Sequence, residues 1–241
     1  MPEELLLPFL KKEQVAKDTY SFYFDRRDVH FDFLAGQYIR LTLSIDVPDD
    51  RGSSRLFSVA SSPLEKEYIM ITTKVLDSAF KKTLVCLASG VKVKIFGPIG
   101  RFVIDEGVQQ PYVFLAGGIG ITPFHSILTY SALKKLSVPI ALFASFSTLE
   151  EMIFYQELTD VARKNPSIKV IYTLTQPERS IAWSGETGRI SEALIKKYSI
   201  DFINSSYYIA GPPKMVTAMD ELAKSMGIED SKIRKENFIG Y

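Results

Sequence analysis

The segment Arg55-Leu56-Phe57-Ser58 combines a cation, an aromatic ring and a hydroxyl in one extended run. An arginine fork pairs with phosphate in a bidentate way, and a flat ring can stack beside it. Strand alternation places the side chains of Arg55 and Phe57 on one face and that of Ser58 on the other. A barrel strand with one surface arginine gives the same pattern, and the chemistry of these residues alone favours that simpler interpretation.

A glycine-rich turn, GGIGITP at residues 117–123, directly follows an apolar strand and opens a helix. Gly118 and Gly120 allow close backbone approach to a diphosphate, the helix N-terminus offers free N–H groups, and the Thr122 hydroxyl adds a donor. Pro123 suits the first helical position. The alternative is a turn that needs glycine only for tight strand-to-helix packing, and the motif alone does not separate the two interpretations.

A later apolar strand, at residues 207–210, ends in a similar turn at Gly211 and Pro212. Two such turns in one sheet favour a dinucleotide. In that case Gly211 and Pro212 let the chain pass beside the nicotinamide end. Met215, which follows them, is expected in the core of the next helix.

The elements that must position these residues fall into two groups. From Leu5 to about Val103 the chain consists of short strand-like segments separated by turns, which predicts an all-β antiparallel barrel of six strands. One short helix is expected at residues 80–87, where apolar residues follow a helical interval. The expected strands are a lead-in at the N-terminus and residues 20–24, 38–43, 56–59, 68–75 and 91–96.

After residues 97–100 the pattern changes to alternating strands and helices. This alternation predicts an α/β domain with a doubly wound, mostly parallel sheet, which binds ligands beyond the carboxyl ends of its strands. We therefore expect a barrel domain at residues 1–106 and an α/β domain at residues 107–241. The expected elements are strands at 112–116, 140–146, 169–174 and 207–210 and helices at 123–136, 150–163 and 214–226.

Composition argues against several classes of protein. A net charge of +1 provides no field to attract nucleic acid, and no apolar run is long enough to span a bilayer. Glu3 and Glu4 stand where a secretion signal carries positive charge, so we expect a cytoplasmic protein. The one cysteine, Cys86, can neither close a disulfide nor hold an iron–sulfur cluster, and no residues have metal-ligand spacing, so no metal is expected.

The order of these motifs resembles that of the ferredoxin–NADP reductase family. The resemblance covers nearly the whole chain and implies a flavin-binding barrel, an NAD(P)-binding α/β domain and no built-in iron–sulfur cluster. The segments that carry it are GQY at 36–38, RLFS at 55–58, GPIGRF at 97–102, GIGITP at 118–123, GPP at 211–213 and ENF at 236–238.

The resemblance implies roles for the barrel residues. Arg55 binds flavin phosphate, Phe57 packs against the isoalloxazine ring, and Ser58 hydrogen-bonds near the reactive nitrogen. The family's usual double glycine before Ser78 is missing, so FAD is preferred over FMN without being required. Lys81 either assists the pyrophosphate or faces solvent. The other implied flavin contacts are Leu56, Thr72, Thr73, Ser78, Ala79 and Phe80.

At the end of the chain, Phe238 lies where the family places an aromatic residue that covers the other flavin face and moves aside for nicotinamide. Glu236 lies where a nearby acid is common, so Ser58, Glu236 and Phe238 form the implied catalytic group. Tyr241 takes over the stacking, lies on the adenine, or frays as a terminus.

For the nicotinamide dinucleotide, the implied contacts are Gly118, Gly120, Thr122, Pro123, Ser145, Gly211 and Pro212. The acids Glu150 and Glu151 near Ser145 favour NADH over NADPH, unless Arg163, Lys164 or Arg179 folds back. Ala210 replaces a cysteine found in many members, so no essential thiol is expected. His125 is expected to be structural or to face solvent.

The expected activity is hydride transfer from NAD(P)H to bound FAD, followed by electron transfer to a separate acceptor such as ferredoxin or an oxygenase component. Two alternatives stay open at this point. One is a reductase that uses free FMN or riboflavin as its substrate, and the other is a non-catalytic electron-transfer subunit of a larger complex. The acceptor itself cannot be identified from the sequence.

Overall fold

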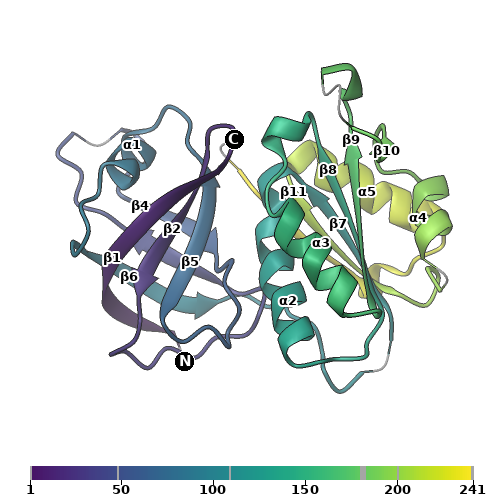
Figure 1. The fold of residues 1–241 in the computed structure, drawn as a ribbon, viewed down its shortest axis with the longest axis horizontal. Coiled ribbons are helices and arrows are strands. Elements are labelled where there is room, and N and C mark those ends of the chain that lie inside the picture. The colour runs from purple at the N-terminus through teal and green to yellow at the C-terminus, as the bar shows by residue number, and fades with distance from the viewer. Residues whose placement is uncertain (1, 48, 109, 180–182, 200, 240–241) are drawn as a thin grey trace.

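The computed structural model describes residues 2–47, 49–108, 110–179, 183–199 and 201–239. The chain forms two lobes that lie side by side, a barrel lobe and an α/β lobe (Figure 1). Tyr241, for which three roles were considered, lies outside the described residues. Both expected fold classes are confirmed, an antiparallel six-stranded sheet followed by a parallel sheet with helices.

The barrel lobe is one antiparallel sheet in the order β4-β3-β6-β1-β2-β5. Its edge strands β4 and β5 come together where the Ala60 amide donates to the Met70 carbonyl oxygen at 2.8 Å. The barrel core is aromatic and aliphatic, with Phe22 and Phe24 fully buried. The strands are β1 (Glu3–Ala16), β2 (Thr19–Asp25), β3 (Tyr38–Thr42), β4 (Ser54–Ser58), β5 (Tyr68–Lys74) and β6 (Lys92–Ile99).

A short helix, α1 (Ala79–Val85), lies between β5 and β6. The Ser78 hydroxyl caps it by accepting a hydrogen bond from the Lys81 amide at 3.1 Å. Phe80 and Leu84 point from the helix into the barrel core. The helix therefore covers the barrel interior while its first turn stays near β4.

The α/β lobe is a parallel sheet in the order β10-β9-β8-β7-β11-β12. Its strands are β7 (Tyr112–Gly117), β8 (Ile140–Phe146), β9 (Ile168–Leu174), β10 (Glu186–Thr187), β11 (Ser206–Gly211) and β12 (Ile233–Asn237). Its helices are α2 (Thr122–Leu133), α3 (Tyr155–Lys164), α4 (Glu192–Tyr198) and α5 (Pro213–Ser225).

Helices cover both faces of this sheet (Figure 1). Every residue of β7 is buried, as expected for a central parallel strand with a helix layer on each side. Phe114 packs on the side of α2 and α3, whereas Val113 and Leu115 pack on the side of α4 and α5. The carboxyl ends of β7 and β11 consequently form a protected central edge.

Several expected boundaries are wrong. The helix predicted from Glu150 begins at Tyr155, because Leu149–Glu151 forms a 3₁₀ turn and Phe154 has a left-handed φ of 59°. The helix predicted to end at residue 136 ends at Leu133, since Lys135 also has a positive φ. The strands β10 and β12 and the helix α4 were not anticipated. Their short or polar sequences show little periodicity.

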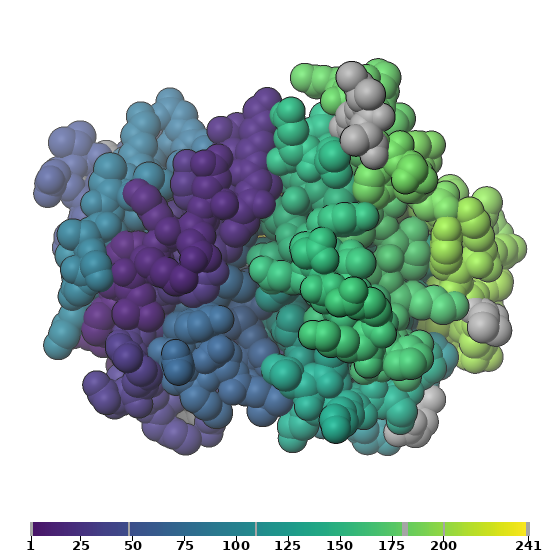
Figure 2. Space-filling view, viewed as in Figure 1, coloured from purple at the N-terminus to yellow at the C-terminus, as the bar shows by residue number. Residues whose placement is uncertain are grey.

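The lobes share packing along their common face (Figure 2). Ala60, Met70 and Phe102 of the first lobe belong to the same buried cluster as Phe124 and Tyr208 of the second. The Tyr208 hydroxyl also donates to the Val103 carbonyl oxygen at 2.7 Å. Within the described residues, the helices are too short or too polar to cross a membrane.

Candidate flavin and nicotinamide site

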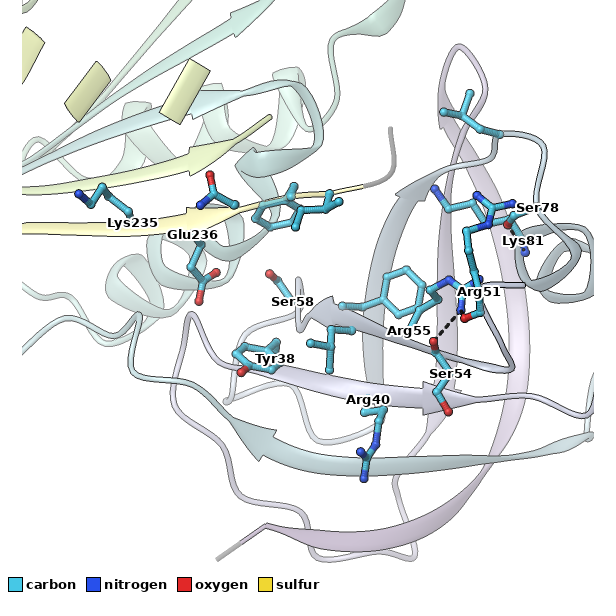
Figure 3. Close-up of a pocket in the computed structure, with 16 residues that line it drawn as sticks. Tyr38, Arg40, Arg51, Ser54, Arg55, Ser58, Ser78, Lys81, Lys235 and Glu236 are labelled. Atoms are coloured by element: carbon cyan, nitrogen blue, oxygen red, sulfur yellow. Dashed lines mark hydrogen bonds between the residues drawn. The ribbon is translucent and has the colours of Figure 1, made fainter. Parts of the chain in front are cut away.

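A cavity of about 800 Å³ opens between the barrel and the last strand of the α/β lobe (Figure 3). Its residues come from β3, β4, the segment around α1, and β12 with the residues that follow it. The lining residues are Tyr38, Arg40, Arg51, Ser54, Arg55, Leu56, Phe57, Ser58, Leu76, Ser78, Lys81, Lys235, Glu236, Asn237, Phe238 and Ile239. The cavity thus joins the RLFS segment to ENF, which lies nearly 180 residues later.

One end of the cavity is cationic. Nη1 of Arg55 donates to the carbonyl oxygens of Arg51, Gly52 and Ser54 at 2.6 to 3.0 Å, which fixes the guanidinium. Its Nη2 is buried and has no hydrogen-bond acceptor among the described residues, although the Asp49 carboxylate lies 3.5 Å away. A buried guanidinium nitrogen left without an acceptor fits a phosphate oxygen.

Lys81 adds a second buried cation to this end. Its Nζ donates to the Lys74 carbonyl oxygen at 2.7 Å, and the side chain is 7% exposed. Burial, followed by repulsion from Arg51 and Arg55, lowers the pKa of Lys81 to about 8. An anionic group in the cavity favours the charged ammonium, so this end is suited to a phosphate.

The aromatic and aliphatic residues of β4 point in different directions. Phe57 lies 5.9 Å from Phe80 between ring centroids, and the Arg55 guanidinium lies 5.1 Å from the same Phe80 ring. Arg55 and Phe57 therefore share a face, as strand alternation predicts. Phe57 and Phe80 belong mainly to the barrel core, with Phe57 6% exposed, whereas Leu56 is 58% exposed at the cavity. Leu56 presents more surface for a flat ring than Phe57 does.

The other end of the cavity carries the expected catalytic group. Ser58 and Glu236 point toward the same part of the cavity (Figure 3). Burial raises the pKa of Glu236 to about 7, so the carboxyl holds a proton over much of the neutral range. The Phe238 amide donates to the Gly211 carbonyl oxygen at 2.9 Å, which fixes the chain where it leaves β12. Serine, glutamate and phenylalanine are thus brought together.

Other expected flavin contacts lie outside the cavity lining. Thr72 and Thr73 are buried on β5, where the Thr72 hydroxyl is 2.7 Å from that of Ser21. The Ala79 amide donates to the Asp49 carboxylate at 3.0 Å. This bond is the largest cause of the lowered pKa of Asp49. A protein carboxylate therefore already engages the amide at which a pyrophosphate was expected.

The glycine turns work mainly through shape. A Cβ on Gly120 would lie 2.3 Å from the Ala210 carbonyl oxygen, so this glycine lets the turn pack against β11. Gly118 has a φ of +52°, and the described residues leave the space at its Cβ position open. Thr122, expected to add a hydroxyl donor for the diphosphate, is engaged within its own turn in this structure. Its hydroxyl donates to the Ile119 carbonyl oxygen at 3.0 Å, and Thr122 is 1% exposed.

The remaining dinucleotide residues meet at one edge of the sheet. Gly117 pairs with Ser145 across β7 and β8, and its backbone would lie 3.2 Å from a Cβ on Gly211. Pro212 and Pro123 each lie at the start of a helix. This edge adjoins β12 through its pairing with β11, but its residues do not line the cavity itself.

Sequence reasoning missed half of the cavity lining. Tyr38 belongs to the GQY segment, and its ring would lie 2.7 Å from a Cβ on Gly100, so the glycine at position 100 was a usable signal for a side chain packed at this place. Arg51 belongs to the polar segment at residues 46–51, whose residue types are typical of a turn and carry no signal of a binding site. The other missed residues are Arg40, Ser54, Leu76, Lys235, Asn237 and Ile239. Among the described residues, histidine, cysteine, aspartate and glutamate do not gather into a metal-binding group.

Two family models match the chain, one in each lobe. The model described as an oxidoreductase FAD-binding domain matches residues 7–104. The model described as an oxidoreductase NAD-binding domain matches residues 114–221. The matches therefore assign FAD to the barrel lobe and a nicotinamide dinucleotide to the α/β lobe.

Curated relatives include reductase components of several systems. A component of the Na⁺-translocating NADH-quinone reductase of Klebsiella pneumoniae is 28% identical, with 86% of this chain and 61% of the relative covered. A flavohemoprotein of Bacillus subtilis is 29% identical, covering 96% and 59%. The reductase component of the glycine betaine monooxygenase of Chromohalobacter salexigens is 25% identical, covering 91% and 60%. The chain thus spans about three fifths of the length of these relatives.

Solved structures share the fold. Amycolatopsis cytochrome P450 reductase GcoB has a TM-score of 0.83 at 20% identity, with 98% of this chain and 70% of the other covered. A ferredoxin NADP⁺ reductase from Neisseria gonorrhoeae, solved with FAD and NADP, has a TM-score of 0.79 at 21% identity, covering 97% and 98%. The two-lobe arrangement is therefore shared across their whole matched length.

Proposed function

Because the chain belongs to the ferredoxin–NADP reductase-like family of flavin and nicotinamide oxidoreductases, we propose that it accepts hydride from NAD(P)H on bound FAD and passes electrons to a separate acceptor. The observation that carries this proposal is the cavity itself. At one end of the cavity, a buried nitrogen of Arg55 has no hydrogen-bond acceptor among the described residues. At the other end, the pKa of the Glu236 carboxyl is raised to about 7.

The cationic end holds the phosphate end of the cofactor. Arg55 supplies its fixed guanidinium, Lys81 supplies a buried ammonium, and Arg51 lines the same wall. The Asp49 carboxylate, which pairs with Arg51 at 2.8 Å, has to yield some of these contacts to a phosphate. The N–H group of Ala79 then becomes available as well.

The opposite end holds the reacting edge of the flavin ring. A bound flavin supplies the hydride and electron chemistry, and the protein supplies position. Ser58 offers a hydroxyl there, Glu236 holds or releases a proton near pH 7, and Phe238 covers the ring until nicotinamide displaces it. Leu56 takes the apolar contact from the barrel side that was expected of Phe57.

The nicotinamide dinucleotide binds at the carboxyl ends of β7 and β11. Gly118 has open space at its Cβ position among the described residues, so the backbone of its turn is accessible to a diphosphate. We place the division between the functional domains at residues 106 and 107, which lie between the two matched segments.

NADH is the preferred donor under this proposal. Glu150 and Glu151 follow β8, where an added 2′-phosphate would need cations. Arg163 is engaged by Asp160 at 2.9 Å near the other end of α3. A lower KM for NADH than for NADPH is the expected result, and the opposite order would reject this assignment.

Anaerobic titration tests the main proposal. Purified protein loaded with FAD should lose its flavin absorbance on addition of NADH, and reoxidation by ferricyanide, ferredoxins, flavodoxins, quinones or ferric chelates would identify the class of acceptor. Relatives named as reductase components of an oxygenase and of a quinone reductase support a protein or quinone acceptor. Failure of both NADH and NADPH to bleach the flavin would overturn the proposal.

A second candidate, a reductase that takes free flavin as its substrate, is favoured by one observation. Asp49 engages Arg51, Arg55 and the Ala79 amide, so the phosphate end is partly neutralised by the protein itself. Such a site would hold flavin weakly. A protein that purifies colourless, yet reduces added FMN with NADH, would support this candidate over the first.

A further inference from the structure

We infer that His125 and Ser126, neighbours near the start of α2, form a clamp that sets the position of the nicotinamide turn relative to the flavin cavity. The inference rests on the proposed hydride transfer. Nδ1 of His125 lies 2.7 Å from the Ala60 carbonyl oxygen, and the Ser126 hydroxyl donates to the Ser61 carbonyl oxygen at 2.7 Å. Two adjacent side chains of one lobe thus hold two adjacent peptide groups of the other.

The clamp connects the end of the strand that carries the flavin residues to the helix that follows the glycine turn. Ala60 and Ser61 follow Ser58 at the end of β4, so they continue the strand that carries the flavin residues. On the other side, α2 begins at Thr122, directly after the glycine turn. The clamp is therefore a short connection between the two parts of the molecule that must bring nicotinamide and flavin together.

The barrel end of the clamp is itself fixed. The Ala60 amide donates to the Met70 carbonyl oxygen at 2.8 Å, and the Met70 amide donates to the Ser61 hydroxyl at 3.0 Å. Ala60, Ser61 and Met70 are all buried. A movement of α2 would consequently be transmitted to the end of β4 and to β5.

Both ring nitrogens of His125 lie within hydrogen-bond distance of an oxygen. The Ala60 carbonyl can only accept, so Nδ1 donates to it. Nε2 lies 2.7 Å from a carboxylate oxygen of Glu157, and this hydrogen bond is the first cause of the lowered pKa of Glu157. The ring is thus held between a carbonyl oxygen of the other lobe and a carboxylate of its own lobe.

Phe154 completes the setting of the imidazole. Its ring centroid lies 4.0 Å from that of His125, with 30° between the planes. Phe154 is one of the non-glycine residues with a left-handed backbone, at a φ of 59°. The Leu158 amide and the Tyr172 hydroxyl both donate to its carbonyl oxygen, which holds this conformation in place. A conformation unfavourable for phenylalanine is thereby kept where its ring contacts His125.

The two lobes are also connected away from the clamp, so the clamp affects the orientation of one lobe relative to the other. The Tyr208 hydroxyl bonds to Val103 and Arg234 bonds to Arg101, so the lobes are also joined near the end of the barrel segment. The Lys17 amide also donates to the Glu150 carbonyl oxygen at 2.9 Å, and Lys74 pairs with Glu151 at 3.6 Å, so the clamp is one of several connections that together fix the relative angle of the lobes. His125 and Ser126 are accordingly positioning residues, with no contact to the reacting atoms proposed for them.

The test uses the full chain with FAD and three variants. His125→Leu removes both ring bonds, whereas His125→Asn keeps a side-chain donor close to the position of Nδ1. Ser126→Ala removes the second bond. Thr129→Val is the matched control, because the Thr129 hydroxyl bonds only to the His125 and Ser126 carbonyl oxygens of its own helix among the described residues.

We expect the His125→Leu, Ser126→Ala double variant to slow flavin reduction by NADH roughly tenfold or more in stopped-flow measurements, since small misplacements of reacting groups are costly. The dissociation constants of FAD and NAD⁺ should change by no more than about twofold, because neither ligand contacts the clamp. The nicotinamide–flavin charge-transfer absorbance should weaken. His125→Asn should recover most of the rate, and Thr129→Val should behave as the unmodified protein.

Hydrogen exchange gives a readout that does not require turnover. In flavin-free protein, the amides of Ala60 and Met70 should exchange roughly tenfold faster in the double variant than in Thr129→Val. Unchanged exchange and unchanged charge-transfer absorbance would overturn the clamp. If the unmodified protein is not reduced by either nicotinamide, the proposed function fails, and the exchange rates alone decide whether the clamp exists.

Discussion

The barrel side of the cavity and the glycine turns of the α/β lobe face the same expected chemistry, a phosphate ligand, but they are built in opposite ways. At the barrel, Arg55 leaves a buried nitrogen without a hydrogen-bond acceptor among the described residues. At the turns, the Thr122 hydroxyl is bonded within its own turn, and Gly120 packs against the Ala210 backbone. The barrel relies on side-chain charge, and the turns rely on the absence of side chains.

The largest effect is expected from a substitution that adds a side chain to a glycine turn of the α/β lobe. Gly120→Ala would place a Cβ 2.3 Å from the Ala210 carbonyl oxygen, and buried backbone cannot easily move away. The free energy of unfolding in urea should fall by roughly 3 kcal/mol.

Gly52→Ala is the matched control. Its φ of +69° is positive, unlike that of Gly120, and the described residues leave its Cβ position open, so a loss of about 1 kcal/mol is expected from backbone strain alone. Equal losses in the two variants would mean that close packing is not the reason for glycine at position 120.

The next largest effect is expected from removing a charge at the barrel side of the cavity. Arg55→Ala should weaken FAD binding by roughly tenfold to a hundredfold, because a charged hydrogen bond to phosphate is lost. Flavin fluorescence during titration measures this change. Arg27→Ala removes a guanidinium whose partner is Asp25 on the barrel surface, and it should leave flavin affinity unchanged. A similar loss in both variants would point to net charge instead of the fixed fork of Arg55.

A smaller effect concerns Glu236. Burial raises the pKa of Glu236 to about 7 from 4.5, so the folded protein binds this proton more tightly than the unfolded chain. Its contribution to stability is present below pH 4.5 and is lost as pH rises to about 7. Glu236→Gln should therefore gain stability relative to the unmodified protein over that range, on the order of 1 kcal/mol after allowance for partial exposure. The measurement is the free energy of unfolding of both proteins at pH 5 and at pH 8. If the difference between the two proteins is the same at both pH values, the assigned burial of Glu236 is contradicted.

The smallest effect is a proton taken up on binding. The pKa of Lys81 is lowered to about 8 in the cavity, and a bound phosphate favours the ammonium form. FAD binding near pH 8 should take up about half a proton, and affinity should fall as pH rises further. Calorimetry in two buffers of different ionisation enthalpy measures the uptake. Lys81→Met should abolish it, and uptake that persists in this variant would assign the proton to another group.

Sequence reasoning located the lobes and the central part of the site because their signals are strong. The apolar strand at residues 112–116 and the segment RLFS are continuous in sequence, and both occur where expected. Motif order also linked Ser58 to Glu236 and Phe238, which the cavity brings together. These associations need no knowledge of side-chain direction.

The rest depended on tertiary contacts that leave little trace in one sequence. Nothing local shows that the Thr122 hydroxyl turns back to Ile119, or that Phe57 is mostly buried in the barrel core while Leu56, which lines the same cavity, is 58% exposed. The break before α3 arises at Phe154, whose left-handed backbone is held by its contacts with His125 and Tyr172. Such features become visible only when distant segments are placed side by side.

The strand β12 belongs to the sheet of one lobe, yet Glu236 on it and Phe238 just beyond it complete the cavity of the other. During synthesis the barrel is made first and can fold while later segments are still emerging. At that stage Arg55 and Lys81 are present, but the acidic and aromatic wall is not. A flavin captured early would be anchored by its phosphates with its ring uncovered, so we expect secure loading of the cofactor to be a late event in the maturation of this protein.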